Sequence, residues 1–165
     1  MNVMFLDMDG VINSNRFEKE YFKENGIRLH GTEIVSPIMV HRINLLIDEF
    51  DLKIVWSSDW RRCCKDIKEC RKLLSSTGIL ADRLIDRTVI DEANIYFPQR
   101  NDEILYYLKH HPEVEFSIII DDRQDAEVKG FENCFFVKTT EEYGFTRKLY
   151  EEAREICLKN IKSKK

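Results

Sequence analysis

The chain alternates between short continuous runs of apolar residues and longer segments in which apolar residues recur every three or four positions. Continuous runs are typical of buried strands, and the longer spacing is typical of one face of an α-helix. We expect strands at residues 3–6, 52–56, 116–120 and 134–137, with a weaker candidate at 84–90. Each of these strands is short, as buried parallel strands usually are.

Helical spacing fills the intervals between these strands. Ser36 and Pro37 suit the cap and the first position of a helix, and apolar residues follow on one face up to residue 50. Further helical patterns run from residue 63 to 74, from 102 to 110 and from about 146 to 157. This alternation predicts a Rossmann-like α/β fold of three layers, in which a parallel sheet of about five strands lies between helices.

Length and composition indicate one globular domain over residues 1–165. We expect residues 13–36 to form a short flap and 160–165 a frayed basic tail, which leaves no segment for a large cap domain. The hydrophobic fraction of 43% and the charged fraction of 34% are ordinary for a globular protein. A net charge of -4 gives no overall field that would attract nucleic acid or an anionic membrane.

The start of the chain lacks the basic and apolar regions of a signal peptide, and no apolar run is long enough to span a bilayer. The five cysteines include no CxxC pair, which favours reduced thiols over a zinc site or a disulfide framework. We therefore expect a cytoplasmic protein that does not bind membranes. No sequence feature indicates a protein partner.

Three of the predicted strands are followed by polar pairs: Asp7 and Asp9, Ser57 and Ser58, and Asp121 and Asp122. In parallel α/β folds, ligands bind beyond the carboxyl ends of the strands, so these pairs should meet at one edge of the sheet. Carboxylates in close contact repel each other by about 1 to 4 kcal/mol per pair. A cation should therefore bind there, and oxygen ligands of this kind suit Mg²⁺. We expect all four aspartates to be metal ligands.

The segments "FLDMDGV" and "IVWSS", then Arg100, then "IIIDDR" occur in this order. Together they resemble the haloacid dehalogenase (HAD) superfamily of phosphohydrolases, over roughly residues 3–146. "SSDWR" and "FVKTTEEYGFT" are similar to small members related to domains of RNA repair proteins, and "IIDDR" is similar to the phosphatase half of phage polynucleotide kinase-phosphatases. The resemblance implies that Asp7 is the nucleophile that takes up the phosphoryl group. It also implies that Asp9 first protonates the leaving oxygen and then activates water.

The remaining candidates are hydroxyl and guanidinium groups that would hold the phosphate. We expect Ser57, Ser58 and Arg100 to bind it; Ser58 and Asp59 should also begin a helix whose free amides favour anions. Arg100 lies 21 residues before Asp121, where the family usually has a lysine, and a guanidinium can do the same electrostatic work. Arg61 and Arg123 are open cases, since each could contact substrate or pair with a neighbouring carboxylate. Trp60 is expected to pack rather than to stack on a ligand.

The predicted function is Mg²⁺-dependent hydrolysis of phosphomonoesters through an aspartyl phosphate on Asp7. Without a large cap the site should be open, which suits a bulky substrate such as the terminal phosphate of a polynucleotide, while a nucleotide stays a candidate. A catalytically silent phosphate-binding module and a phosphotransferase with the same phosphoaspartate are the alternatives. A response-regulator receiver is disfavoured because its acidic pair comes first in the chain and its phosphorylated aspartate comes later.

Overall fold

The structure is a computed structural model that describes residues 1–89 and 97–161. Its sheet has five strands in the order β3-β2-β1-β4-β5, and every neighbouring pair is parallel. The strands are β1 (Asn2–Leu6), β2 (Lys53–Trp56), β3 (Leu84–Arg87), β4 (Phe116–Asp121) and β5 (Cys134–Lys138). The predicted α/β fold with a parallel sheet of about five strands is confirmed. The weaker strand was expected to reach Ile90, which lies outside the described residues.

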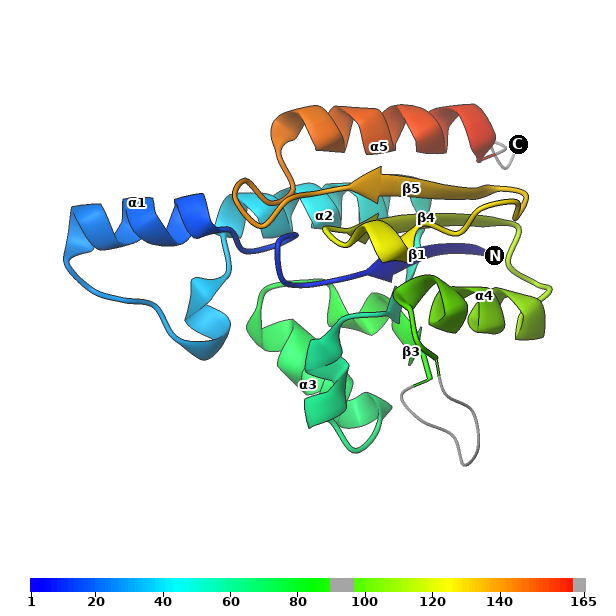
Figure 1. Ribbon diagram of the computed structural model, residues 1–165, viewed down its shortest axis with the longest axis horizontal. Helices are drawn as coiled ribbons and strands as arrows, with labels where there is room; N and C mark the ends of the chain where they lie inside the picture. The colour runs from blue at the N-terminus through cyan, green and yellow to red at the C-terminus, as the bar shows by residue number, and fades with distance from the viewer. Residues whose placement is uncertain (90–96, 162–165) are drawn as a thin grey trace.

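Helices cover both faces of the sheet (Figure 1). They are α1 (Asn15–Asn25), α2 (Pro37–Phe50), α3 (Ile67–Ser76), α4 (Arg100–His110) and α5 (Arg147–Asn160). Apolar residues of α2, α3 and α5 share one core with Met4 and Leu6 of β1. Residues of α4 share the other core with Val3 and Phe5. Successive residues of a strand point to opposite faces, which explains why β1 contributes to both cores.

The region that we expected to be a flap contains α1, a helix that the sequence pattern did not predict. Ser14 caps it by accepting a hydrogen bond from the Phe17 amide, and Gly26 ends it with a φ of 68°. The helix has no buried residue and projects from the body on the left of Figure 1. Phe17 and Tyr21 lie one turn apart, but most residues of α1 are polar or charged, so the helix offers too few apolar positions for the pattern on which the prediction rested.

The helix expected over residues 63–74 begins later than expected, at Ile67, and ends at Ser76. A short 3-10 helix, Asp59–Cys63, follows β2, and α3 begins only after Asp66, whose side chain accepts a 2.8 Å hydrogen bond from the Glu69 amide. An aspartate at this position caps a new helix instead of continuing the old one. Of the tail expected at 160–165, Asn160 belongs to α5, and residues 162–165 lie outside the described residues. Within the described ranges, no helix combines the length and apolar character that crossing a membrane requires.

Candidate active site

Three carboxylates meet at the carboxyl edge of the two central strands, β1 and β4. Asp7 follows β1, Asp121 ends β4, and Asp122 comes next. One oxygen from each of the three lies within 4.8 Å of the others. The Asp7 amide donates a 3.1 Å hydrogen bond to the Ile120 carbonyl, so the sheet ladder itself fixes the first acid beside the other two. The edge predicted from the polar pairs is thus formed.

The three acids lie in an environment that disfavours their charged forms. Burial, followed by repulsion from Asp7, raises the pKa of Asp121 to about 7. The pKa of Asp122 is raised to about 6 by the same two causes, and burial also raises the pKa of Asp7. Asp121 is fully buried, and its Oδ2 has no hydrogen-bond partner among the described residues. Hard oxygen ligands and an unsatisfied buried carboxylate oxygen fit a divalent cation such as Mg²⁺.

The turn after β1 depends on Gly10. Its φ is 65°, in the left-handed region that residues with a side chain rarely adopt. A Cβ atom at this position would lie 2.6 Å from Asp122 Oδ2. Gly10 therefore both allows the bend and leaves room for Asp122.

Asp9 is oriented by two donors from outside the acid cluster. Asn13 Nδ2 donates a 2.9 Å hydrogen bond to Asp9 Oδ1, and Trp60 Nε1 donates a 2.8 Å hydrogen bond to Oδ2. Among the described residues, the group able to hold a metal contains Asp7, Asp121 and Asp122 but not the Asp9 side chain, contrary to our expectation of four carboxylate ligands. Trp60 does pack partly against the core, as expected, but its indole N–H has a second role that the sequence did not reveal.

Arg100 places a guanidinium group beside Asp7 and Asp121. Its Nη1 lies 3.8 Å from Asp7 Oδ1 and 3.9 Å from Asp121 Oδ2, and the residue is only 3% exposed. Nη1 has no hydrogen-bond partner within the described ranges. The start of α4 at Arg100, two residues earlier than expected, brings this side chain to the sheet edge. A buried donor with unused capacity is thus held next to the expected nucleophile.

The two serines after β2 also lie at this edge. The Ser57 amide donates to the Leu6 carbonyl at 3.1 Å, while Ser57 Oγ is buried and has no partner in the described part of the chain. The charge of Arg100 and a hydrogen bond from the Ser58 side chain partly offset the effect of burial on the pKa of Asp7. The expected helix start at Ser58 and Asp59 is confirmed, and the helix is a 3-10 helix of five residues that Ser58 caps.

Arg61 supports the loop rather than facing solvent. It is fully buried, and its Nη1 donates to the Ser57 and Ser58 carbonyls at 2.8 and 2.7 Å. Its Nη2 donates a 2.6 Å hydrogen bond to Glu103 Oε2 of α4. A substrate at the surface would not reach a guanidinium whose donors are used in this way. Of the two interpretations left open for Arg61, the structure favours pairing with a carboxylate over contact with substrate.

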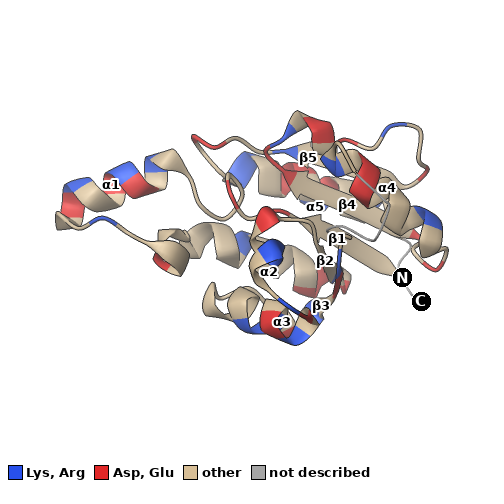
Figure 2. Cartoon of the chain, turned by 60° about the horizontal axis from the view of Figure 1, so that its bottom comes forward, with Lys and Arg blue, Asp and Glu red and all other residues tan. Residues whose placement is uncertain are grey.

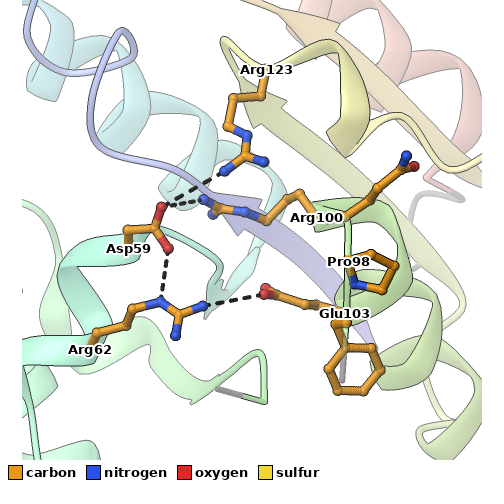
Figure 3. Close-up of a pocket in the computed structure, with 8 residues that line it drawn as sticks. Asp59, Arg62, Pro98, Arg100, Glu103 and Arg123 are labelled. Atoms are coloured by element: carbon orange, nitrogen blue, oxygen red, sulfur yellow. Dashed lines mark hydrogen bonds and ion pairs between the residues drawn. The ribbon is translucent and has the colours of Figure 1, made fainter. Parts of the chain in front are cut away.

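Arg123 is half exposed and pairs with neighbouring carboxylates, which is one of the two interpretations left open for it. Its Nε and Nη2 donate to Asp125 at 2.9 and 2.6 Å, and its Nη1 lies 3.8 Å from Asp59 Oδ2. Its amide donates to Asp121 Oδ1 at 2.9 Å. Arg123 also lines a pocket of about 430 Å³ next to the acid cluster, together with Arg62, Arg100 and Asp59 (Figure 3).

The parallel sheet with helices on both faces, the acids that follow β1 and β4, and the absence of a large cap in the described residues define a HAD-like domain. A family model described as "HAD domain in Swiss Army Knife RNA repair proteins" matches residues 3–149. The chain belongs to this family, as the resemblance of its motifs implied. A search of curated proteins gave no match. Family membership suggests a phosphatase-type hydrolase.

Proposed function

We propose that the protein hydrolyses phosphomonoesters with the help of Mg²⁺ and through an aspartyl phosphate on Asp7. The observation that carries the proposal is the position of Asp7. It is 4% exposed, lies in the group formed with Asp121 and Asp122, and has Nη1 of the Arg100 guanidinium 3.8 Å from its Oδ1. A nucleophilic carboxylate needs these surroundings if it is to approach a phosphate dianion, because cations must offset the repulsion between them.

In the first step, an Asp7 carboxylate oxygen attacks phosphorus and the bond from phosphorus to the leaving oxygen breaks. Asp9 supplies the proton that the leaving oxygen needs, and the product alcohol departs. The hydrogen bonds from Asn13 and Trp60 hold the Asp9 carboxyl in place for this transfer. Arg100 and Ser57 have donors available for the phosphoryl oxygens.

In the second step, a water molecule attacks the phosphorus of the aspartyl phosphate. Asp9, now deprotonated, takes a proton from that water, and the bond between phosphorus and the Asp7 oxygen breaks. Inorganic phosphate leaves and both carboxyl groups return to their starting states. Asp7, Asp121 and Asp122 would hold Mg²⁺, which supplies positive charge that stabilises the phosphoryl group in both steps.

The terminal phosphate of a nucleotide or polynucleotide is the substrate that we propose. Two features support this choice: the family is described by its occurrence in RNA repair proteins, and the described residues include no large cap domain that would enclose a small metabolite.

Release of phosphate from an aryl phosphate, with Mg²⁺ and with EDTA, tests the reaction. We expect turnover that requires Mg²⁺ and is abolished in Asp7→Asn. In Asp9→Asn, turnover should fall by about 10² to 10⁴-fold while mass spectrometry still detects phosphorylated Asp7. A silent binding module would release no phosphate from any substrate. A phosphotransferase would transfer the group to an added alcohol in preference to water.

A further inference from the structure

Three arginine side chains converge on one carboxylate in the pocket beside the active site (Figure 3). Arg62 Nε donates a 3.0 Å hydrogen bond to Asp59 Oδ1. Arg100 Nη2 and Arg123 Nη1 lie 3.4 and 3.8 Å from Asp59 Oδ2. Arg62 lies in the 3-10 helix after β2, Arg100 begins α4, and Arg123 lies in the loop after β4. The fold therefore brings together three arginines from distant parts of the sequence.

Asp59 is an accessible counterion for these arginines. Its side chain is 56% exposed, so water or a ligand can reach it. Its two carboxylate oxygens serve these three guanidinium groups and also the buried Arg61, whose Nη1 lies 3.7 Å from Oδ1. The distances to Arg100 and Arg123 are longer than hydrogen bonds. A phosphate group offers more oxygens and more charge, and guanidinium groups bind it in pairs of parallel hydrogen bonds. A phosphate would therefore satisfy this site better than Asp59 does.

Arg100 connects this pocket to the nucleophile. Its Nη2 faces Asp59, while Nη1 of the same guanidinium group faces Asp7 and is buried without a hydrogen-bond partner in the described residues. An anion in the pocket would thus lie one guanidinium group away from the phosphate that Asp7 attacks. This is the arrangement expected for two phosphates carried by one small substrate.

Resting on the proposed function, we infer that the pocket is a subsite for a second phosphate of the substrate, and that Asp59 pairs with its arginines until that phosphate displaces it. The substrate class is a phosphomonoester whose leaving group carries another phosphate; a nucleoside bisphosphate is the smallest example. The charge around the pocket favours contact with one additional phosphate over contact with a long polyanion. In Figure 2, the ribbons of α1 and α3 include both basic and acidic residues, and the net charge of the whole chain is -4.

Equilibrium binding to the Asp7→Asn protein tests the subsite apart from catalysis. Calorimetry in Mg²⁺ would compare cytidine 3′,5′-bisphosphate with cytidine 3′-monophosphate and cytidine 5′-monophosphate. We expect the bisphosphate to bind at least about tenfold more tightly than either monophosphate, with an advantage that shrinks as salt rises. Equal affinities would overturn the subsite, whatever the wild-type protein does to an aryl phosphate. If the wild-type protein does not hydrolyse an aryl phosphate, the proposed function is rejected, and the binding comparison still decides whether the pocket holds a second phosphate.

Variants in the same Asp7→Asn background assign the contact to named residues. Arg123→Ala should remove most of the bisphosphate advantage, whereas Lys72→Ala, a change at an exposed basic residue of α3, should leave it intact. Asp59→Asn should strengthen bisphosphate binding several-fold because it removes the one carboxylate charge that Arg62, Arg100 and Arg123 share, while the Arg123 pair with Asp125 remains. Unchanged or weaker binding in Asp59→Asn would overturn the displacement of Asp59. An equal loss in the Arg123 and Lys72 variants would mean general charge attraction and would overturn the subsite.

Discussion

Trp60 Nε1 donates a 2.8 Å hydrogen bond to Asp9 Oδ2, across 51 positions of the sequence. Asn13 Nδ2 donates to the other oxygen of the same carboxylate. Asp9 therefore has one donor from its own turn and one from the 3-10 helix after β2. For a residue proposed to transfer a proton, this arrangement restricts the orientation of the carboxyl group.

Trp60→Phe removes the indole donor and keeps an aromatic ring against the core. A hydrogen bond to a charged group contributes about 1.5 to 3 kcal/mol, so kcat/KM should fall by about 10 to 150-fold. The loss should be larger for an alkyl phosphate than for an aryl phosphate, because a poor leaving group depends more on the proton from Asp9. Equal losses for both substrates would mean that Trp60 does not act through Asp9. A thermal melt of the variant would show whether packing has changed.

Gly10→Ala should weaken both the fold and the metal site. The positive φ costs about 1 to 2 kcal/mol for a residue with a side chain, and the new Cβ would also displace Asp122. Gly130→Ala is a matched control, since Gly130 has a φ of 73° and nothing within 4 Å of its ideal Cβ. Urea unfolding and Mg²⁺ titration would compare the two. If both variants bind Mg²⁺ as the wild-type protein does, the close approach of Asp122 to Gly10 is irrelevant to the site.

The strands and the sheet edge were predictable because their signals are local. Continuous apolar runs identified β1, β2, β4 and β5, and polar residues directly after three of them located the acids and the serines. A parallel sheet brings such positions to one edge whatever the loops do. Hence the proximity of Asp7, Asp121 and Asp122 was predictable from the sequence alone.

The orientation of side chains was not predictable in this way. Arg61 and Arg62 are adjacent and chemically identical, yet Arg61 is buried against Glu103 and Arg62 lines the pocket. The contact between Trp60 and Asp9 and the convergence of arginines on Asp59 join residues from distant segments. No short pattern records such contacts. The helix α1 was missed for a different reason, since it buries no apolar face.

The stability of the metal-free protein should fall as pH rises from about 4 to 7, as far as the acid cluster is concerned. The folded-state pKa values of Asp121 and Asp122 are raised to about 7 and 6, whereas an aspartate in the unfolded chain has its ordinary pKa of 3.8. At a pH between 3.8 and these raised values, the folded protein therefore holds protons that the unfolded chain has lost. Stability decreases with pH wherever the folded state binds more protons. Mg²⁺ should reverse this trend because it binds the charged carboxylates.

Thermal melts with EDTA and with Mg²⁺, from pH 5 to pH 8, would measure this linkage. At a hundredfold excess over its dissociation constant, Mg²⁺ should stabilise the fold by about 2.7 kcal/mol near pH 7.5 and by much less at pH 5. Asp121→Asn should lose most of the effect of Mg²⁺, whereas Asp48→Asn, a change at an exposed carboxylate far along α2, should keep it. An Mg²⁺ effect that is equal at both pH values would contradict the titration of this cluster.

Glu103→Gln should destabilise the protein strongly because it leaves the Arg61 guanidinium buried without its counterion. The side chains of Arg61 and Glu103 are 0% and 7% exposed, and removing one partner of a buried pair costs about 3 to 5 kcal/mol. Glu49→Gln is the matched control: its ion pair with Arg154 is equally short at 2.6 Å but lies at the surface, where such pairs contribute about 0 to 1 kcal/mol. Urea unfolding would measure both changes.

Because Arg61 also holds the Ser57 and Ser58 carbonyls, Glu103→Gln should reduce phosphatase turnover as well, and Glu49→Gln should not. Equal, small losses of stability in the two variants would show that the buried pair does not support the loop.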